Sequence, residues 1–188
     1  MRRSLLTVGL AATFLISFTA VHGQGAKPAP GPAGPIVVIE TAKGVIEIET
    51  FPNEAPKSVA RFLELIKRGF YRGQRFHWVA TGVIQAGDPL SRDLTKQREW
   101  GTGGSGPRNA NKPIGVAEPS KRKFERGIVG LAYRPNWKPE TADSMFFILT
   151  GPNPNLNGKY AVLGRVTKGM QVADKIELQD VIKNISVR

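Results

Sequence analysis

Residues 36–49 read IVVIETAKGVIEIE, and this stretch indicates the kind of fold. Two β-branched runs, Ile36–Glu40 and Val45–Glu49, are separated by Thr41–Gly44. β-Branched residues favour strands, and a glycine between two such runs is typical of a tight chain reversal. The second run alternates apolar residues with glutamate, so one face of its strand is expected to contact water. The stretch therefore predicts an antiparallel β-hairpin.

The rest of the chain continues the β pattern around two helical segments. Apolar residues recur at helical spacing after Pro56 and stop before Gly69, which predicts a helix over 56–68 with a glycine cap. A second, shorter helix is expected over 170–177, with Ala173 and Ile176 facing inward. Further strand-like runs cover 73–88 around Gly82, and 127–133, 144–150 and 160–166.

Between these elements, residues 89–120 are rich in glycine, proline, serine and charge. This composition predicts a long excursion with little regular structure, and such loops are usually functional or mobile. Many strands with only two helices predict a closed or nearly closed β architecture.

The composition excludes several kinds of site. The 188 residues include no cysteine, which excludes disulfides, thiolate metal sites, iron–sulfur clusters and a cysteine nucleophile. A histidine-based metal site or a Ser–His–Asp triad would depend on His22 or His77, the only two histidines.

The first 35 residues are not expected to belong to the fold. A basic start, Arg2–Arg3, precedes a mostly apolar run over 5–20 and small residues near Gly23, which is typical of a secretory signal peptide over 1–23. A membrane anchor helix is the alternative, but the run is shorter than the ~20 residues that a spanning helix needs. Residues 24–35, with four prolines, predict an extended tether. We therefore expect export to the periplasm or beyond, with no stable membrane insertion after cleavage.

Net charge gives only weak indications of a partner. The chain carries +12, and the domain over 36–188 keeps +9 once Arg2, Arg3 and Lys27 are set aside. The glycine-rich run 101–106 has no following Lys-Ser/Thr and no helix, so it does not predict a phosphate site. The basic run 121–123 lacks aromatic stacking partners and is interpreted as a solvated loop. We expect no nucleic-acid partner.

Three blocks of sequence occur in an order that matches a known family. Residues 76–79 (FHWV) are followed by 85–89 (QAGDP), then by 142–148 (ADSMFFI) and 156–164 (LNGKYAVLG). Their pattern resembles that of the cyclophilin-type peptidyl-prolyl isomerases, which usually show Phe-His-Arg, Gln-Gly-Gly-Asp, Ser-Gln-Phe-Phe-Ile and Leu-Asp-Gly-Lys. The resemblance covers about residues 36–188. It implies a closed eight-stranded antiparallel β-barrel capped by two α-helices.

The resemblance also implies a groove for X-Pro peptides and catalysis of rotation about the peptide bond. Uncatalysed, this rotation has a barrier of ~18–20 kcal/mol. No bond is made or broken, so no metal, nucleophile or cofactor is required. A donor directed at the twisted amide nitrogen would stabilise the transition state selectively. The expected partners are proline-containing polypeptides, and the protein is expected to be a monomer.

Carried over position by position, the resemblance implies both retained and altered site residues. Trp78 stands where the family has its catalytic arginine, the segment from Trp78 to Gln85 is one residue shorter than usual, and Met145 replaces a groove glutamine. Trp78, Gln85 and Phe147 are the candidate catalytic residues. The candidate substrate-binding residues are His77, Val83, Ala132, Tyr133, Met145, Leu156 and Tyr160.

Some residues near these motifs have a structural interpretation as well. His77 is interpreted as a packed strand residue, because amide rotation needs no general base. Arg75 lies three residues before Trp78 and should face the other side of a strand, whereas Arg134 is a freer candidate for a replacement donor.

Three functions remain open at this point. The first is a secreted peptidyl-prolyl isomerase, weakened by Trp78, that assists folding outside the cytoplasm. The second is a catalytically inactive module that binds proline peptides. The third is a basic adhesion or scaffold domain near an anionic envelope, which only the charge supports.

Overall fold

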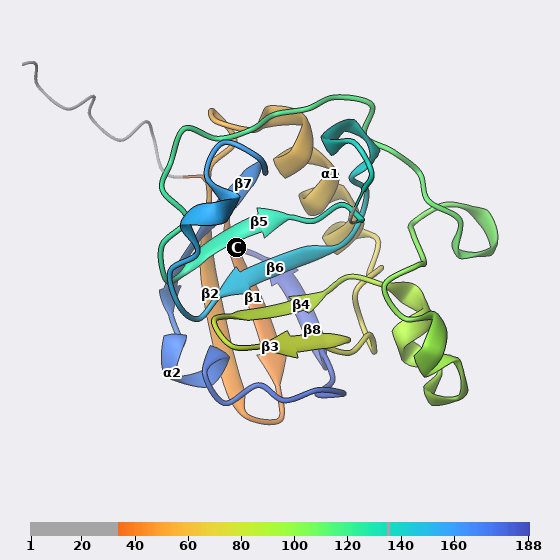
Figure 1. Ribbon diagram of the computed structural model, residues 1–188. Coiled ribbons are helices and arrows are strands. Elements are labelled where there is room, and N and C mark those ends of the chain that lie inside the picture. The colour runs from red at the N-terminus through yellow and green to blue at the C-terminus, as the bar shows by residue number, and fades with distance from the viewer. Residues whose placement is uncertain (1–33, 135) are drawn as a thin grey trace, which may run out of the picture. The chain divides into compact units, whose positions relative to one another are not determined.

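The computed structural model describes residues 34–134 and 136–188 (Figure 1). The predicted signal peptide and most of the predicted tether lie outside the described residues. At the end of the tether, Gly34 and Pro35 already exchange backbone hydrogen bonds with Thr50. The ordered domain therefore begins by residue 34.

Within residues 34–134 and 136–188 the fold consists of eight strands and two α-helices, with short 3₁₀ turns in the loops. All strand pairs are antiparallel. The helices are α1 (Pro56–Lys67) and α2 (Met170–Ala173). The strands are β1 (Ile36–Thr41), β2 (Gly44–Thr50), β3 (Trp78–Ala80), β4 (Val83–Ala86), β5 (Ile128–Leu131), β6 (Phe146–Leu149), β7 (Val162–Lys168) and β8 (Asn184–Val187).

The expected closed barrel is wrong in one respect, because the sheet is an open, curled half-barrel. The strand order is β3-β4-β6-β5-β7-β2-β1-β8, so β3 and β8 form its two edges (Figure 1). These edge strands have only three and four residues. The segments before them, 73–76 and 179–182, exchange backbone hydrogen bonds and one isolated bridge, Arg75↔Val181. The two edges therefore approach each other without a continuous ladder.

The first hairpin forms as predicted. β1 pairs with β2 from Ile36↔Glu49 to Thr41↔Gly44, and Ile46 and Ile48 are fully buried. Gly44 has φ +132, a conformation that other residues rarely adopt, so the glycine permits the reversal. The sequence analysis predicts no strand after residue 166, and β8 is therefore an addition. Its four residues are too few for their alternation of apolar and polar side chains to stand out.

The helices differ from expectation in length. α1 ends at Lys67, and Gly69 adopts the left-handed conformation (φ +69) that favours a glycine after a helix. α2 covers 170–173 only, and the chain to residue 177 continues in turns. Ala173 and Ile176 are nevertheless buried, as predicted.

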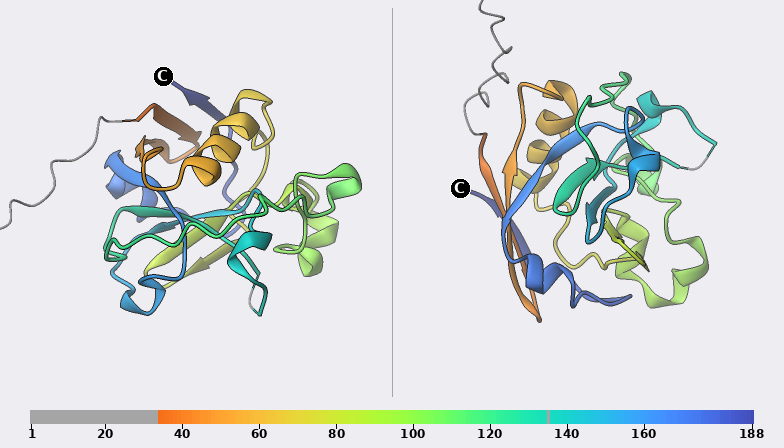
Figure 2. Two further views of the ribbon diagram at one scale, coloured as in Figure 1. Left: turned by 90° about the horizontal axis from the view of Figure 1, so that it is seen from above. Right: turned by 60° about the vertical axis from the view of Figure 1, so that its left-hand side comes forward.

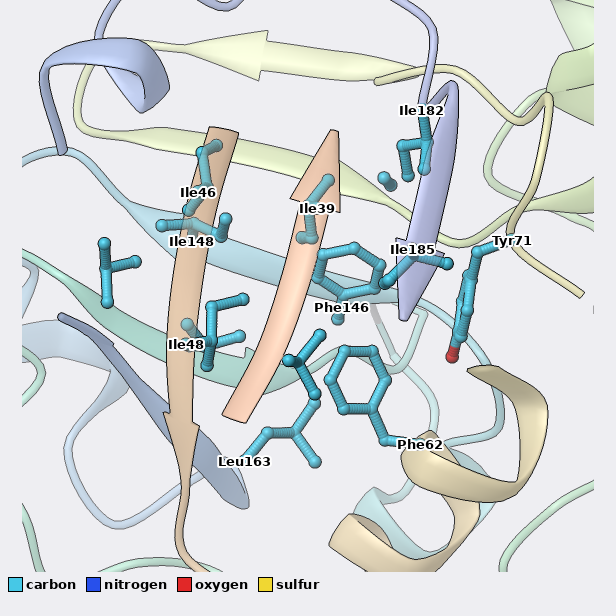
Figure 3. Packing of buried hydrophobic residues seen from close by; sticks show 14 of the residues in the cluster. Ile39, Ile46, Ile48, Phe62, Tyr71, Phe146, Ile148, Leu163, Ile182 and Ile185 are labelled. Atoms are coloured by element: carbon cyan, nitrogen blue, oxygen red, sulfur yellow. The ribbon is translucent and has the colours of Figure 1, made fainter. Parts of the chain in front are cut away.

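The main core lies between α1 and the concave side of the sheet (Figure 3). The Phe62 ring on α1 meets the rings of Tyr71 and Phe146 at centroid distances of 5.5 and 5.2 Å. The Tyr71 hydroxyl donates a 2.9 Å hydrogen bond to the Ser144 carbonyl. These contacts fix the start of β6, the strand that carries Phe147.

The long excursion 89–120 is held by buried carboxylates. Asp143, 3% exposed, accepts hydrogen bonds from the backbone amides of Ser105 (2.6 Å) and Lys112 (2.9 Å) and from the Ser105 hydroxyl (2.5 Å). A Cβ on Gly104 would lie 2.7 Å from the same carboxylate, so a glycine is needed there. In Figures 1 and 2 the first part of this excursion, in yellow-green to green, extends to one side of the sheet, and its later part runs back past α1.

The excursion also caps α1. The helix has no capping side chain at Ala55, and its N-terminal amides would lack partners. Glu118 fills this role from the loop, accepting hydrogen bonds from the amides of Lys57 (3.0 Å) and Ser58 (2.8 Å). A carboxylate at this end also interacts favourably with the helix dipole.

We expect Glu118→Ala to lower the free energy of unfolding by about 1 kcal/mol, the usual cost of losing an N-terminal cap. Denaturant unfolding of the full chain measures the change. Glu125→Ala, an exposed glutamate without a side-chain partner among the described residues, is the matched control. Equal stability of the two variants would contradict the capping role.

Candidate active site

A cavity of about 490 Å³ opens on the side of the sheet away from α1, beside β3, β4 and β6. Its wall contains all ten residues proposed from the sequence, together with Trp100, Gly101, Arg134 and Asn153. The structure thus brings the candidate residues together, while their individual roles remain predictions.

Strand register explains why residues so far apart in sequence meet here. Trp78 pairs with Gln85, Gln85 with Phe147, and Phe147 with Gly130. Side chains on directly opposed residues of neighbouring strands share one face of a sheet. The three candidate catalytic residues therefore form one row across β3, β4 and β6, and Gly130 on β5 ends the row.

Gly130 provides the room for the Phe147 ring. A Cβ at residue 130 would lie closer than 3.0 Å to three carbons of that ring. The ring then packs at centroid distances of 5.5 Å from Tyr160 and 6.2 Å from Phe124. Tyr160 in turn stacks on Tyr133 at 4.5 Å. The result is an aromatic floor, of the apolar kind that lines many small-ligand pockets.

The shortened segment after Trp78 is a tight hairpin. β3 and β4 are joined at Thr81–Gly82, and Gly82 has φ +83. Val83 therefore starts β4 directly, opposite Leu149, and forms the wall of the cavity. This explains how an aliphatic residue occupies the place where the family resemblance leads us to expect an aromatic one.

Comparison of the sequence with a family model and with known proteins identifies the family of the chain. Residues 36–187 match the model described as cyclophilin type peptidyl-prolyl cis-trans isomerase. The chain belongs to the cyclophilin-type peptidyl-prolyl cis-trans isomerase family. A probable peptidyl-prolyl cis-trans isomerase of Brucella abortus is 38% identical over 156 residues, which are 81% of this chain and 76% of that protein. A Helicobacter pylori peptidyl-prolyl cis-trans isomerase is 36% identical over 150 residues, 78% and 83% of the two chains.

A solved structure extends this likeness. A cyclophilin-type isomerase of Cryptosporidium parvum, crystallised in the presence of the dipeptide Ala-Pro, superimposes with a TM-score of 0.69 at 29% identity. The match covers 81% of this chain and 98% of that one. The protein is accordingly an isomerase of the cyclophilin type.

The wall of this cyclophilin site also contains residues that sequence reasoning did not place there. Trp100 is fixed by its indole N–H, which donates to the carbonyls of Leu90 (3.0 Å) and Asp93 (3.1 Å). Gly101 donates its amide to the buried Asp88 carboxylate at 2.5 Å. The glycine-rich run 101–106, which does not predict a phosphate site, therefore supplies backbone amide donors to the Asp88 carboxylate. The signal available in the sequence was the run of glycines itself.

Cations are scarce around the row of candidate catalytic residues. Trp78 is 51% exposed and offers a neutral indole N–H where the family has its arginine. Arg75 does not line the cavity and donates to the Gln179 carbonyl at 3.0 Å instead, in agreement with its predicted orientation. Arg134 does line the cavity. Among residues 34–134 and 136–188, no cluster of potential metal ligands occurs.

His77 lies behind this row as a neutral, packed side chain. It is 9% exposed, and its Nε2 lies 3.2 Å from the amide nitrogen of Gln85. Burial lowers the pKa of His77 from 6.5 to about 4, although the nearby Asp88 charge opposes the shift. Its Nδ1 has no partner among the described residues. These properties suit a residue that orients Gln85.

The lowered pKa of His77 makes stability depend on pH. Below pH 6.5 the His77 imidazole binds a proton in the unfolded chain but stays neutral in the folded chain. The contribution of the neutral His77 to the free energy of unfolding is therefore fully present above pH 6.5 and is lost as pH falls toward 4. We expect a loss of about 2 kcal/mol between pH 7 and pH 5, at about 1.4 kcal/mol per unit. Denaturant unfolding of wild type and His77→Gln at several pH values measures it. Parallel pH profiles would contradict this explanation.

Gly130→Ala is expected to displace the Phe147 ring and to destabilise the fold by about 1–3 kcal/mol, the usual cost of overpacking. Affinity for a proline peptide should fall as well, because the floor of the cavity changes. All three tryptophans of the chain lie in the cavity wall or beside Arg134, so their fluorescence reports binding.

Gly151→Ala is the matched control for this variant, because its Cβ would meet only the Gly82 backbone at 3.4 Å. Unchanged peptide affinity in Gly130→Ala would show that the close packing of Phe147 is not required.

Proposed function

We propose that the chain is an exported peptidyl-prolyl isomerase that assists folding outside the cytoplasm, and that it rotates X-Pro bonds more slowly than relatives with the arginine. The observation that carries the proposal is the cavity built on Phe147, with Gln85 and Trp78 in the same row. The Ala-Pro dipeptide present with the Cryptosporidium parvum relative supports a proline peptide as the ligand.

The chemistry follows from the nature of the amide. Rotation passes through a twisted state in which conjugation is lost, at a cost of ~18–20 kcal/mol in water. An apolar floor holds the proline ring in place. The carbonyl group of the preceding residue can then rotate about the peptide bond near polar groups at the rim of the cavity. Only interactions that are stronger in the twisted state than in the planar state increase the rate. The amide of Gln85, which also contacts His77 and Met145, and the indole N–H of Trp78 are neutral donors in the row beside Phe147.

The replacement of the arginine accounts for the proposed low rate. Removing one preorganised donor from a site that stabilises charge costs about 10²–10³ in rate. A neutral donor recovers only part of this, because charge-assisted hydrogen bonds are roughly twice as strong. Trp78 is also half exposed, so water competes for its indole. The site is therefore expected to be weak and not inactive.

Export rests on the N-terminal sequence alone. The basic start, the apolar run and the small residues near Gly23 support a signal peptide, and these residues lie outside the described part of the chain. Within the described ranges, none of the helices has the length and apolar character that crossing a bilayer requires. We propose a monomer that is released from the membrane after cleavage.

Trp78→Arg should raise kcat/KM for an X-Pro peptide by up to about 10²–10³ and leave affinity nearly unchanged, because the donor acts in the twisted state. A protease-coupled isomerisation assay gives the rate, and tryptophan fluorescence gives the affinity. Ala80→Arg is the matched control, since it adds the same charge at the next exposed position of β3, outside the cavity wall.

Two results would contradict the proposal. A wild-type rate equal to that of arginine-bearing relatives would show that another donor is in place. Binding without any acceleration of rotation would favour the inactive proline-peptide-binding module.

A further inference from the structure

Arg134 gives the cavity a distinct charge. It is the only residue of the described wall that carries a charge at neutral pH, because the wall contains no carboxylate and His77 is neutral. The surrounding domain carries +9, so its field favours anionic groups near the opening.

Arg134 also has few partners of its own. Some arginines form ion pairs, as Arg122 does with Glu54 and Arg126 with Asp174, whereas Arg75 also has a buried Nε without an acceptor but lies outside the cavity wall. Among residues 34–134 and 136–188, Arg134 takes part in no such ion pair, and its Nε is buried without an acceptor. A buried donor without a partner is costly, so this arginine lacks the compensation that a paired one has.

The guanidinium is nevertheless held in place. Its Cζ lies 4.4 Å from the centroid of the Trp137 ring, so its plane is supported by the indole. Stacking of this kind uses the face of the guanidinium and leaves its N–H edge available. That edge matches the two oxygens of a carboxylate.

Register places Arg134 away from the row that would hold the amide. Gly130 opposes Phe147, the Ala132 amide still donates to the Met145 carbonyl at 2.8 Å, and Arg134 comes two residues later. β5 ends at Leu131, and four residues of extended chain span at most ~13 Å, so Arg134 lies within that distance of Gly130. An extended peptide with its proline on Phe147 would therefore present a neighbouring side chain to Arg134.

We propose that Arg134 is a specificity-determining residue that binds an acidic side chain of the peptide, within about three residues of the proline. The inference rests on the proposed function, because it takes the proline on Phe147 as its reference point. It differs from a role of Arg134 as the donor to the twisted amide. A specificity residue changes the ranking of peptides, whereas a donor would change the rate for all of them.

The test compares short peptides with one central proline that carry Glu, Gln or Lys at each nearby position in turn. Wild-type full chain should favour Glu over Lys at one of these positions by about tenfold in kcat/KM and in affinity, which is about 1.4 kcal/mol. Arg134→Gln should abolish this preference. Arg134→Lys should restore part of it. Arg165→Gln removes the same charge from the exposed side of β7, outside the cavity, and should keep the preference.

The outcomes distinguish failure of the specificity role of Arg134 from failure of the proposed function. If wild type ranks Glu and Lys peptides equally while turning them over, the role of Arg134 is refuted and the proposed function stands. If Arg134→Gln slows all peptides equally, Arg134 acts as the donor and the specificity role is wrong. If wild type turns over no peptide, the proposed function fails, and fluorescence-detected binding of Glu against Lys peptides still decides the preference.

Discussion

The contact between Phe147 and Gly130 is the constraint on which the site depends. Because residue 130 has no side chain, the Phe147 ring can lie on β5 and form a floor with Tyr160. The same register places Gln85 and Trp78 beside that ring. One row of paired residues thus sets the position of the floor and of both neutral donors, and the loops only complete the wall.

The loop that completes the wall is fixed by charge buried inside the protein. Asp88 and Asp143 are almost inaccessible, and the backbone amides of residues 101–112 satisfy them. Buried carboxylates need such donors, and the glycines at 103 and 104 let the loop approach closely enough to supply them. A long segment without regular strands can therefore hold Trp100 in place at the cavity.

Periodicity predicted the first hairpin and α1, because strand alternation and helical spacing are local properties. The set of residues around the cavity followed from the resemblance to the cyclophilin-type family, because local patterns do not show which distant residues meet. Local patterns did not predict β8, the open edges of the sheet or the length of α2. These features depend on contacts between segments that are distant in the sequence. Local patterns also missed Gly130 and Trp100. A glycine in a strand shows its purpose only when the ring packed against it is known, and Trp100 reaches the site through contacts with Asp93 and Leu90.

The central claim is that an apolar floor with neutral donors suffices for slow rotation of an X-Pro bond. Exchange NMR on a proline peptide with a small amount of the full chain tests it most directly, because it observes the cis and trans forms without a coupling enzyme. We expect cis–trans exchange peaks, with an exchange rate that rises with protein concentration but stays below the rate given by arginine-bearing relatives. Peptide resonances that shift on binding while the exchange rate stays at its uncatalysed value would contradict it.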